Sequence, residues 1–379
     1  LRVSGLELAS KPLALRADLE LATARVDLRL DRAIVDFASL AKLMPDLPLI
    51  GTMAASGRIQ GPISAPRGQI DLQGRDLRAT GEPESPTLAL DGVLALEPGT
   101  LRIDLSAQGL GPTPLTVKGS VGLAAEAGGL PAPTPASPLD IRLAWAGDIG
   151  PLIILAPLDD HRLTGGAAID MTLRGTVGQP SATGTASLND GRYEHLDFGS
   201  ALAFERIEIV ANGPNIELKP FTAQAGEGTI SAGGTALLDT AMHYPFQLEA
   251  NLQNARLTAR DDITANASGA IRLDNGSTGM QVFARLKTDR VEMELVDNLP
   301  ADIPALAVIE TGPIPKGRKH EAKPDAKSGP PIALDIQIEV PGQFFVRGRG
   351  LESEWQGAVA VAGTAAKPVV NGRLDLKRG

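Results

Sequence analysis

The chain has 379 residues, of which 43% are hydrophobic but only 3% aromatic, so its apolar surface is almost entirely aliphatic. The absence of cysteine excludes disulfides, thiolate zinc sites and cysteine catalysis. A net charge of −9 with no visible basic face argues against nucleic acid as a general partner.

Alternation of apolar and polar residues, the period of a half-buried strand, is the dominant pattern. Glycine, proline, asparagine and aspartate interrupt it every ten or so residues, as hairpin turns require. We therefore predict a nearly all-β chain of about two dozen strands. The clearest alternating runs are, in chain order, 13–30, 101–107, 141–145, 207–209, 246–252, 271–273, 282–295, 334–340, 359–361 and 374–376.

Helical periodicity is confined to two short stretches. The first covers residues 37–44 and stops at Pro45, and the second covers residues 149–155 and stops near Pro157. Each is about two turns long, too short to be stable unless it docks on an apolar surface.

An internal repeat combines the motif G-x4-P with the alternating strands that flank it. Copies occur at Gly61–Pro66, Gly175–Pro180 and Gly363–Pro368, and short helical stretches that begin after Asp36 and Asp148 precede the first two. Glycine allows a positive φ and proline fixes its own φ, so each copy predicts a turn between two strands. Repeats that add strand to strand favour one extended sheet over several compact domains.

An apolar face that runs through so many strands has to be covered. A sandwich would cover it with a second sheet, and a barrel would close on itself. The shortage of aromatics argues against an outer-membrane barrel, which carries aromatic girdles. We predict instead a long, curved and twisted sheet, a U-shaped groove with a hydrophobic interior and one or two short helices. Such a face would need a ligand.

The predicted organisation divides this sheet into three β-groove segments. They are residues 1–123, with the first repeat; 139–310, with the second; and 332–379, with the third. Residues 124–138, rich in Ala, Gly and Pro, are predicted to connect the first two. The basic stretch 311–331, flanked by Pro and Gly, is predicted to be a disordered loop.

The segment 340–357, VPGQFFVRGRGLESEWQG, resembles the "aP-x-x-x-fVRGrGLd-x-E-x-x-G" signature of the TamB family, within the AsmA-like superfamily. Residues 361–379 continue that resemblance with "G-T-x-x-x-P" and a terminal "R-G". The family-motif residues are Val346, Arg347, Gly348, Arg349, Gly350 and Leu351.

The resemblance implies a periplasmic section of a protein of a diderm bacterium that is anchored in the inner membrane and spans the envelope. Such proteins form a "β-taco" whose groove carries phospholipid acyl chains toward the outer membrane. They also pair with a TamA-like outer-membrane barrel and assist outer-membrane protein assembly. We expect the membrane anchor, and the C-terminal region that meets the barrel, to lie outside this sequence.

No catalytic, cofactor or metal site is expected. Asp159, Asp160 and His161 are adjacent, so extended backbone would direct them to opposite faces. Arg347 and Arg349 could contact lipid phosphates, but pairing with Glu352 and Glu354 is the preferred interpretation. The groove-lining candidates are the aliphatic members of the alternating runs: Leu19, Leu28, Leu101, Ile103, Leu105, Ile141, Leu143, Ile207, Ile209, Leu248, Leu252, Ile271, Leu273, Leu286, Val291, Met293, Leu334, Ile336 and Ile338.

Two other functions stay open from the sequence. The chain could be a chaperone or scaffold whose sheet edges receive outer-membrane protein substrates. It could also be a β-solenoid surface protein, although solenoid repeats of about 20 to 30 residues are much shorter than this one.

Overall fold

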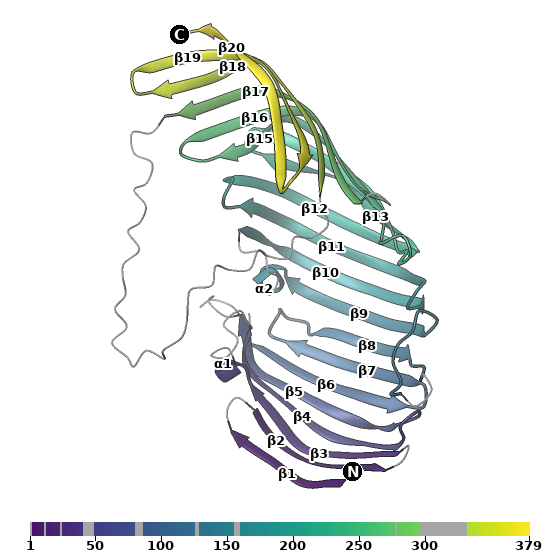
Figure 1. Ribbon diagram of the computed structural model, residues 1–379. Helices are drawn as coiled ribbons and strands as arrows, with labels where there is room; N and C mark the ends of the chain where they lie inside the picture. Colours follow the sequence, from purple (N-terminus) through teal and green to yellow (C-terminus); the bar gives the residue numbers. More distant parts are fainter. Residues whose placement is uncertain are drawn as a thin grey trace, which may run out of the picture. The chain divides into compact units, whose positions relative to one another are not determined.

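A computed structural model describes residues 2–10, 13–22, 25–40, 49–79, 86–125, 129–154, 160–276, 279–295 and 332–379. These residues confirm the predicted fold class: one long, mostly antiparallel sheet that does not close, with two short helices (Figure 1). The predicted loop 311–331 lies outside the described residues. In chain order the elements are β1 (Arg2–Ser10), β2 (Leu13–Ala22), β3 (Arg25–Asp36), α1 (Phe37–Leu40), β4 (Leu49–Pro62), β5 (Arg67–Ala79), β6 (Leu88–Glu97), β7 (Thr100–Gln108), β8 (Leu115–Gly122), β9 (Pro138–Asp148), α2 (Gly150–Ile154), β10 (His161–Thr176), β11 (Pro180–His195), β12 (Ser200–Gly213), β13 (Asn215–Ala225), β14 (Gly228–Leu237), β15 (Phe246–Ala259), β16 (Ile263–Gly276), β17 (Gly279–Glu294), β18 (Ala333–Gly348), β19 (Leu351–Thr364) and β20 (Lys367–Arg378).

The chain separates into two compact units. The first unit comprises Leu1–Asp197, Ala201–Gln224 and Ser231–Leu248, and the second comprises Phe198–Ser200, Ala225–Ile230 and Glu249–Gly379. Neither helix of the described chain is long and apolar enough to cross a membrane.

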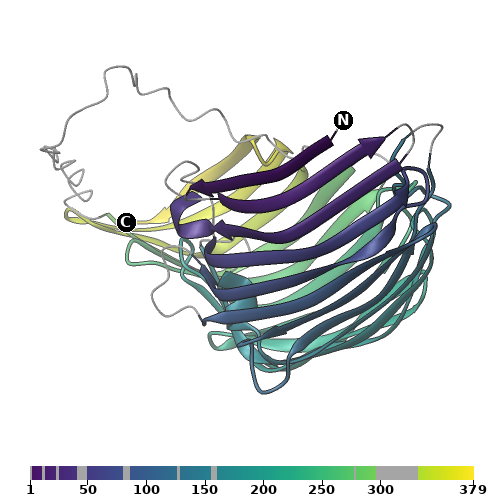
Figure 2. The ribbon, with the colours of Figure 1, turned by 90° about the horizontal axis from the view of Figure 1, so that it is seen from below.

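The first unit is built from hairpins. Each strand from β1 to β10 pairs antiparallel with the next one in the sequence. Figure 2 shows the early strands of this unit lying side by side, with α1 at one of their ends. This hairpin ladder differs from a β-solenoid, whose strands stack in parallel coils, so that alternative is wrong.

The second unit contains one exception to the hairpin rule among its described pairs. β16–β17, β18–β19 and β19–β20 are antiparallel, whereas β17 and β18 pair in parallel from Gln281–Ala333 to Glu294–Arg347. A parallel pair cannot be joined by a tight turn. Residues 295–332 stand between these two strands in the sequence and include the predicted loop 311–331, but the sequence did not predict the parallel pairing.

All three G-x4-P motifs are hairpin turns, as the repeat predicts. They join β4 to β5, β10 to β11 and β19 to β20. Gly175 faces Pro180 across the base of its hairpin, and Gly363 faces Pro368 in the same way. The repeat's first glycines have φ values of +121°, +99° and +87° at Gly61, Gly175 and Gly363, which L-residues adopt only with strain.

The two predicted helices exist and begin in the same manner. The backbone N–H of Ser39 donates to Asp36 Oδ1 at 3.3 Å, and that of Gly150 donates to Asp148 Oδ1 at 2.8 Å. An aspartate at this position pairs with N–H groups that the first helical turn leaves open. The repeat thus places an aspartate-capped helix after β3 and again after β9.

Gly184 in β11, four residues after the proline of the second G-x4-P motif, occupies a position where glycine is required. Its φ is +129°, and a Cβ there would lie 2.1 Å from the backbone oxygen of Asp170 in β10. Gly184→Ala is expected to lower the free energy of unfolding by about 1–3 kcal/mol, because the strand must shift or unpair. Gly166→Ala is the matched control, since a Cβ on Gly166 of β10 would meet nothing within 4 Å. Urea unfolding measures both, and an equal response of the two variants would contradict the assignment.

The sheet buries few large side chains. Among the described residues no large side chain is fully buried, and about half of the buried hydrophobic residues are alanines. The aliphatic side chains of the strands are mostly half-buried. Because an ordinary β-sandwich buries such side chains against a second sheet, the structure leaves much of this apolar surface uncovered.

Candidate functional site

One face of the first unit carries continuous rows of aliphatic side chains. Residues that oppose each other directly across a strand pair share a face, so the register defines rows that run across the strands. Three such rows can be followed through this unit. They are Leu28–Ile59–Gly68–Leu96–Leu101–Val121–Leu139, Leu30–Gly57–Ile70–Leu94–Ile103–Gly119–Ile141–Leu173, and Leu72–Gly92–Leu105–Val117–Leu143–Met171–Gly184. We call this surface the first apolar face.

Six groove-lining candidates lie in these rows: Leu28, Leu101, Ile103, Leu105, Ile141 and Leu143. Leu19 opposes Leu28 in the register and so extends the first row by one strand. The structure describes its backbone but not its side chain. The rows also contain glycines among the branched side chains, which the sequence analysis did not predict. A Cβ on Gly92 would lie 2.3 Å from Leu105 Cδ2, so the large side chain of one strand fills the space above its neighbour's glycine.

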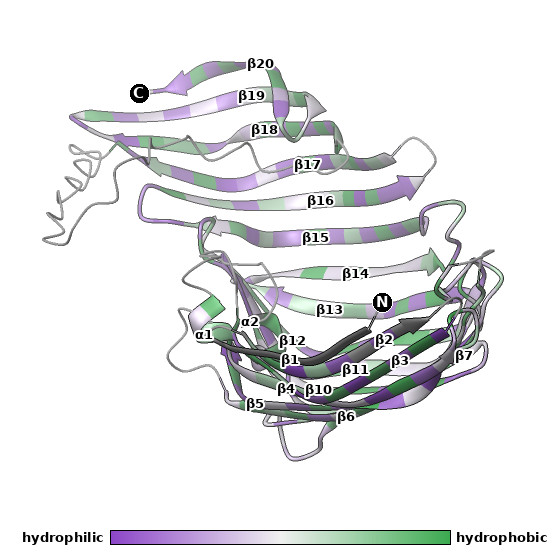
Figure 3. Cartoon of the chain, turned by 60° about the horizontal axis from the view of Figure 1, so that its bottom comes forward, coloured by the Kyte–Doolittle hydropathy of each residue, from purple (hydrophilic) through white to green (hydrophobic). Residues whose placement is uncertain are grey.

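The opposite face of the first unit is polar and carries ion pairs between neighbouring strands. Arg58 donates two hydrogen bonds to Asp27, at 3.0 and 2.7 Å, and thereby lowers the pKa of that carboxyl group. Arg142 in β9 lies 3.1 Å from Asp170 in β10, with both side chains more than half exposed. Exposed pairs of this kind add little stability, so they chiefly identify the water-facing side. Figure 3 shows the resulting alternation of hydrophobic and hydrophilic residues along the strands.

The second unit has an equivalent surface, the second apolar face. Its rows include Leu273–Val282–Leu334–Gly363, Ile271–Ala284–Ile336–Val361–Val370, Gly269–Leu286–Ile338–Val359–Gly372, Ala265–Val291–Phe344–Trp355–Leu376 and Ile263–Met293–Val346–Ser353. All eight candidates of β16 to β18 therefore share one face. These eight are Ile271, Leu273, Leu286, Val291, Met293, Leu334, Ile336 and Ile338.

The four remaining candidates lie in β12 and β15. Ile209 opposes Leu218 of β13, and Ile207 is half-buried two residues before it on β12. Leu248 is half-buried in the first unit, and Leu252 is buried in the second.

A compact cluster covers part of the first apolar face near α1 and α2, and the sequence did not reveal it. Its buried members are Leu77, Leu88, Leu110, Trp145 and Ala167, against which Phe37, Leu49, Met53, Leu90, Leu115, Ile149, Leu152, Ile169 and Leu188 pack. We call this the edge cluster. Trp145 belongs to the alternating run 141–145 that the sequence analysis identified. Nothing in the sequence except its large side chain set it apart from Ile141 and Leu143 in that run.

The family motif forms the hairpin that joins β18 to β19. Gly348 opposes Leu351, and Arg349 and Gly350 between them have φ values of +54° and +80°. Positive φ at both central residues is the requirement of a type I′ turn, which suits two twisted strands. A Cβ on Gly348 would lie 2.5 Å from the backbone oxygen of Leu295, so the first glycine permits a close backbone approach.

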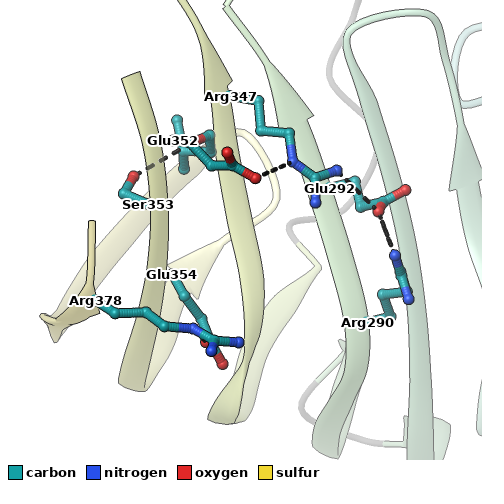
Figure 4. A network of polar contacts seen from close by, with 8 residues as sticks. Arg290, Glu292, Arg347, Glu352, Ser353, Glu354 and Arg378 are labelled. Atoms are coloured by element: carbon teal, nitrogen blue, oxygen red, sulfur yellow. Dashed lines mark hydrogen bonds and ion pairs between the residues drawn. The ribbon is translucent and has the colours of Figure 1, made fainter. Parts of the chain in front are cut away.

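Arg347 lies between Glu352 and Glu292 on the polar side of this hairpin (Figure 4). In the strand register it opposes Glu294 of β17. Its guanidinium contacts Glu352 and Glu292, each at 3.3 Å, and stacks on the ring of Phe345. The predicted pairing of Arg347 with Glu352 is therefore confirmed. The pKa of Glu292 is lowered, first by the hydrogen bond from Arg290 and then by Arg347.

Glu354 is a buried carboxylate with three donors. Its side chain is only 3% exposed, and it accepts from the backbone N–H of Gln343 at 3.0 Å and from Lys377 Nζ at 3.1 Å. Arg378 donates to its other oxygen. These contacts, led by the Gln343 N–H, lower the pKa of Glu354 to about 2. Glu354 thus joins β18, β19 and β20 at one point.

The histidines form no arrangement suited to catalysis in the described structure. His161 and His195 oppose each other in β10 and β11, and His161 Nδ1 lies 2.7 Å from the hydroxyl of Tyr193. Burial raises the pKa of Tyr193. Asp159, the first residue of the Asp159-Asp160-His161 stretch, lies outside the described residues.

Comparison with known proteins gives one family. Residues 217–379 match the family of the TamB C-terminal domain. A search of curated proteins and a search of solved structures found no match. The matched segment contains the second apolar face, the VRGRG hairpin and Glu354, so the resemblance drawn from residues 340–379 is confirmed over a longer stretch. Over residues 217–379 the chain is therefore similar to the TamB C-terminal domain family.

Proposed function

We propose that this chain is a periplasmic part of an inner-membrane-anchored, TamB-like protein that carries phospholipids between the two membranes of a diderm bacterium. The acyl chains would lie on the first and second apolar faces, whose aliphatic candidates are the proposed contact residues. The observation that carries the proposal is the continuity of the aliphatic rows on faces that are only half-buried.

The match of residues 217–379 to the TamB C-terminal domain family supports the same interpretation. The TamB family is non-enzymatic transport and assembly machinery of the diderm cell envelope. Its role further implies a TamA-like outer-membrane barrel as partner and a contribution to outer-membrane protein assembly, which we include in the proposal.

The chemistry of the faces suits an acyl chain. Each methylene that leaves water for such a surface contributes about 0.8 kcal/mol, and no hydrogen bond is needed along the chain. Rows of Leu, Ile and Val offer similar contacts at every step, so a chain can shift from strand to strand without leaving a deep pocket.

Site-specific photo-crosslinking in cells tests this function. A photoreactive amino acid at Leu143 or Ile336, on the apolar faces, is expected to form phospholipid adducts. The same amino acid at Arg142 or Gln337, one residue away on the polar faces, is expected to form few, because neighbouring strand residues point to opposite sides. Adducts only to outer-membrane proteins would favour a chaperone, and equal lipid adducts at all four positions would contradict the proposed faces.

A further inference from the structure

The two tryptophans of the chain differ in how their indole N–H groups are satisfied. Trp355 Nε1 donates to Ser353 Oγ at 3.0 Å. Trp145 is only 4% exposed, and its Nε1 is buried without a hydrogen-bond partner among the described residues. A buried donor left unpaired is costly, and native proteins leave few of them.

The surroundings of Trp145 identify the kind of group that could pair with it. Its buried neighbours are Leu77, Leu88, Leu110 and Ala167, which offer no side-chain acceptor. The buried side chains of this cluster supply no polar group other than the indole N–H, whereas a trapped water needs two to four polar partners. An apolar molecule that carries a hydrogen-bond acceptor matches these surroundings.

The position of Trp145 connects it with the first apolar face. It lies two residues beyond Leu143 on β9 and opposes Ile169 of β10. An acyl chain that crosses β9 at Leu143 would thus lie one row away from the indole, on the same face. In a glycerophospholipid each acyl chain ends in an ester carbonyl, which accepts hydrogen bonds and donates none.

Leu110, which packs with Trp145 in the edge cluster, lies in a loop and not in a paired strand. Leu110 belongs to the loop 109–114 between β7 and β8, where Thr113 Oγ1 donates to the carbonyl of Ala146 at 2.6 Å. The same hydroxyl accepts from the N–H of Ala146 at 3.0 Å. Displacing Leu110 costs these two hydrogen bonds and local packing but leaves the β8–β9 pairing intact.

We propose that Trp145 is a positioning residue for acyl esters: when Leu110 withdraws, its indole N–H donates to the ester carbonyl of a phospholipid on the first apolar face. This inference rests on the proposed function and adds a preference for ester-linked over ether-linked lipid. One net hydrogen bond corresponds to a preference of about twofold to tenfold.

The test is a competition between two lipids that differ only at this group. The purified chain is incubated in detergent with equimolar diester and diether phosphatidylglycerol whose hydrocarbon chains have the same length. It is then purified again, and its bound lipids are quantified by mass spectrometry. The unsubstituted chain is expected to be enriched in the diester. Trp145→Phe, which keeps an aromatic ring but lacks the N–H, is expected to bind both equally.

Trp355→Phe is the matched control, because that indole is already paired, and it is expected to keep the diester preference. Equal binding of the two lipids by the unsubstituted chain would overturn the inference and leave the proposed function standing, whether or not Trp145→Phe folds. A preference that survives in Trp145→Phe would also overturn it. Capture of neither lipid would count against the proposed function itself.

Discussion

Leu143→Asp is expected to reduce the phospholipid recovered with the chain at least tenfold while the sheet remains folded. Leu143 occupies the row between Val117 and Met171, and its side chain is half-buried rather than enclosed. A carboxylate there can reach water in the lipid-free protein, so folding tolerates it. A lipid that lies across this row must cover the charge or lift away from the surface.

Either response costs more free energy than the roughly 1.4 kcal/mol that corresponds to a tenfold loss of binding. Lifting exposes two or more methylenes at about 0.8 kcal/mol each, and covering an unpaired carboxylate costs more. Lipid extraction and mass spectrometry after purification from cells measure the effect, with circular dichroism to verify the fold.

Thr172→Asp is the control for charge alone. Thr172 directly opposes Arg142 on the polar face of β10, so a carboxylate there gains an opposite charge and meets no lipid. Unchanged lipid recovery is expected for this variant. If Leu143→Asp retained its lipid, or if both variants lost it equally, the first apolar face would not be the contact surface.

Alternation predicted the strands because burial on one face imposes period two whatever the strand pairs with. Leu101, Ile103 and Leu105 indicated β7 correctly, and the glycine and proline of each G-x4-P motif located three hairpins. For the same reason, alternation does not show whether a strand pairs in parallel or antiparallel with its neighbour. The run 334–340 looks alike in a parallel or an antiparallel pair, so the parallel pairing of β17 with β18 could not be predicted.

The sequence predicted which residues of each strand lie on the apolar face, but not which residues of neighbouring strands lie side by side in a row. Which residue of β8 faces Ile103 depends on turn lengths and bulges, and these place Gly119 there. The edge cluster required more, since it brings Leu77 and Leu110 onto Trp145 from separate elements. No local pattern encodes such a contact.

Glu354 shows how a bulge overrides alternation. Its neighbours Glu352 and Gln356 are exposed, as their positions in the strand predict, but Glu354 is buried. The cause lies in β18, where Gln343 adopts a φ of +56° within a register shift between Val340 and Phe344. That shift turns the Gln343 N–H toward the carboxylate.

Glu354→Gln is expected to destabilise the second unit clearly and Glu352→Gln to do so little. Glutamine has the shape of glutamate but no charge, so Lys377 and Arg378 would lose their shared counter-ion at a buried site. Glu352, with 78% of its side chain exposed, pairs with Arg347 at the surface. In a Trp145→Phe background, the fluorescence of Trp355 follows the unfolding of this region beside Glu354.

The pH dependence separates the charge from the shape. Because folding lowers the pKa of Glu354 from 4.5 to about 2, its ionised form stabilises the folded state fully above pH 4.5. That contribution is lost progressively as the pH falls from about 4.5 toward 2. Thermal unfolding followed through Trp355 should therefore show a steeper fall with acid in the parent chain than in Glu354→Gln. Parallel curves for the two proteins would mean that the carboxylate does not hold β18, β19 and β20 together through its charge.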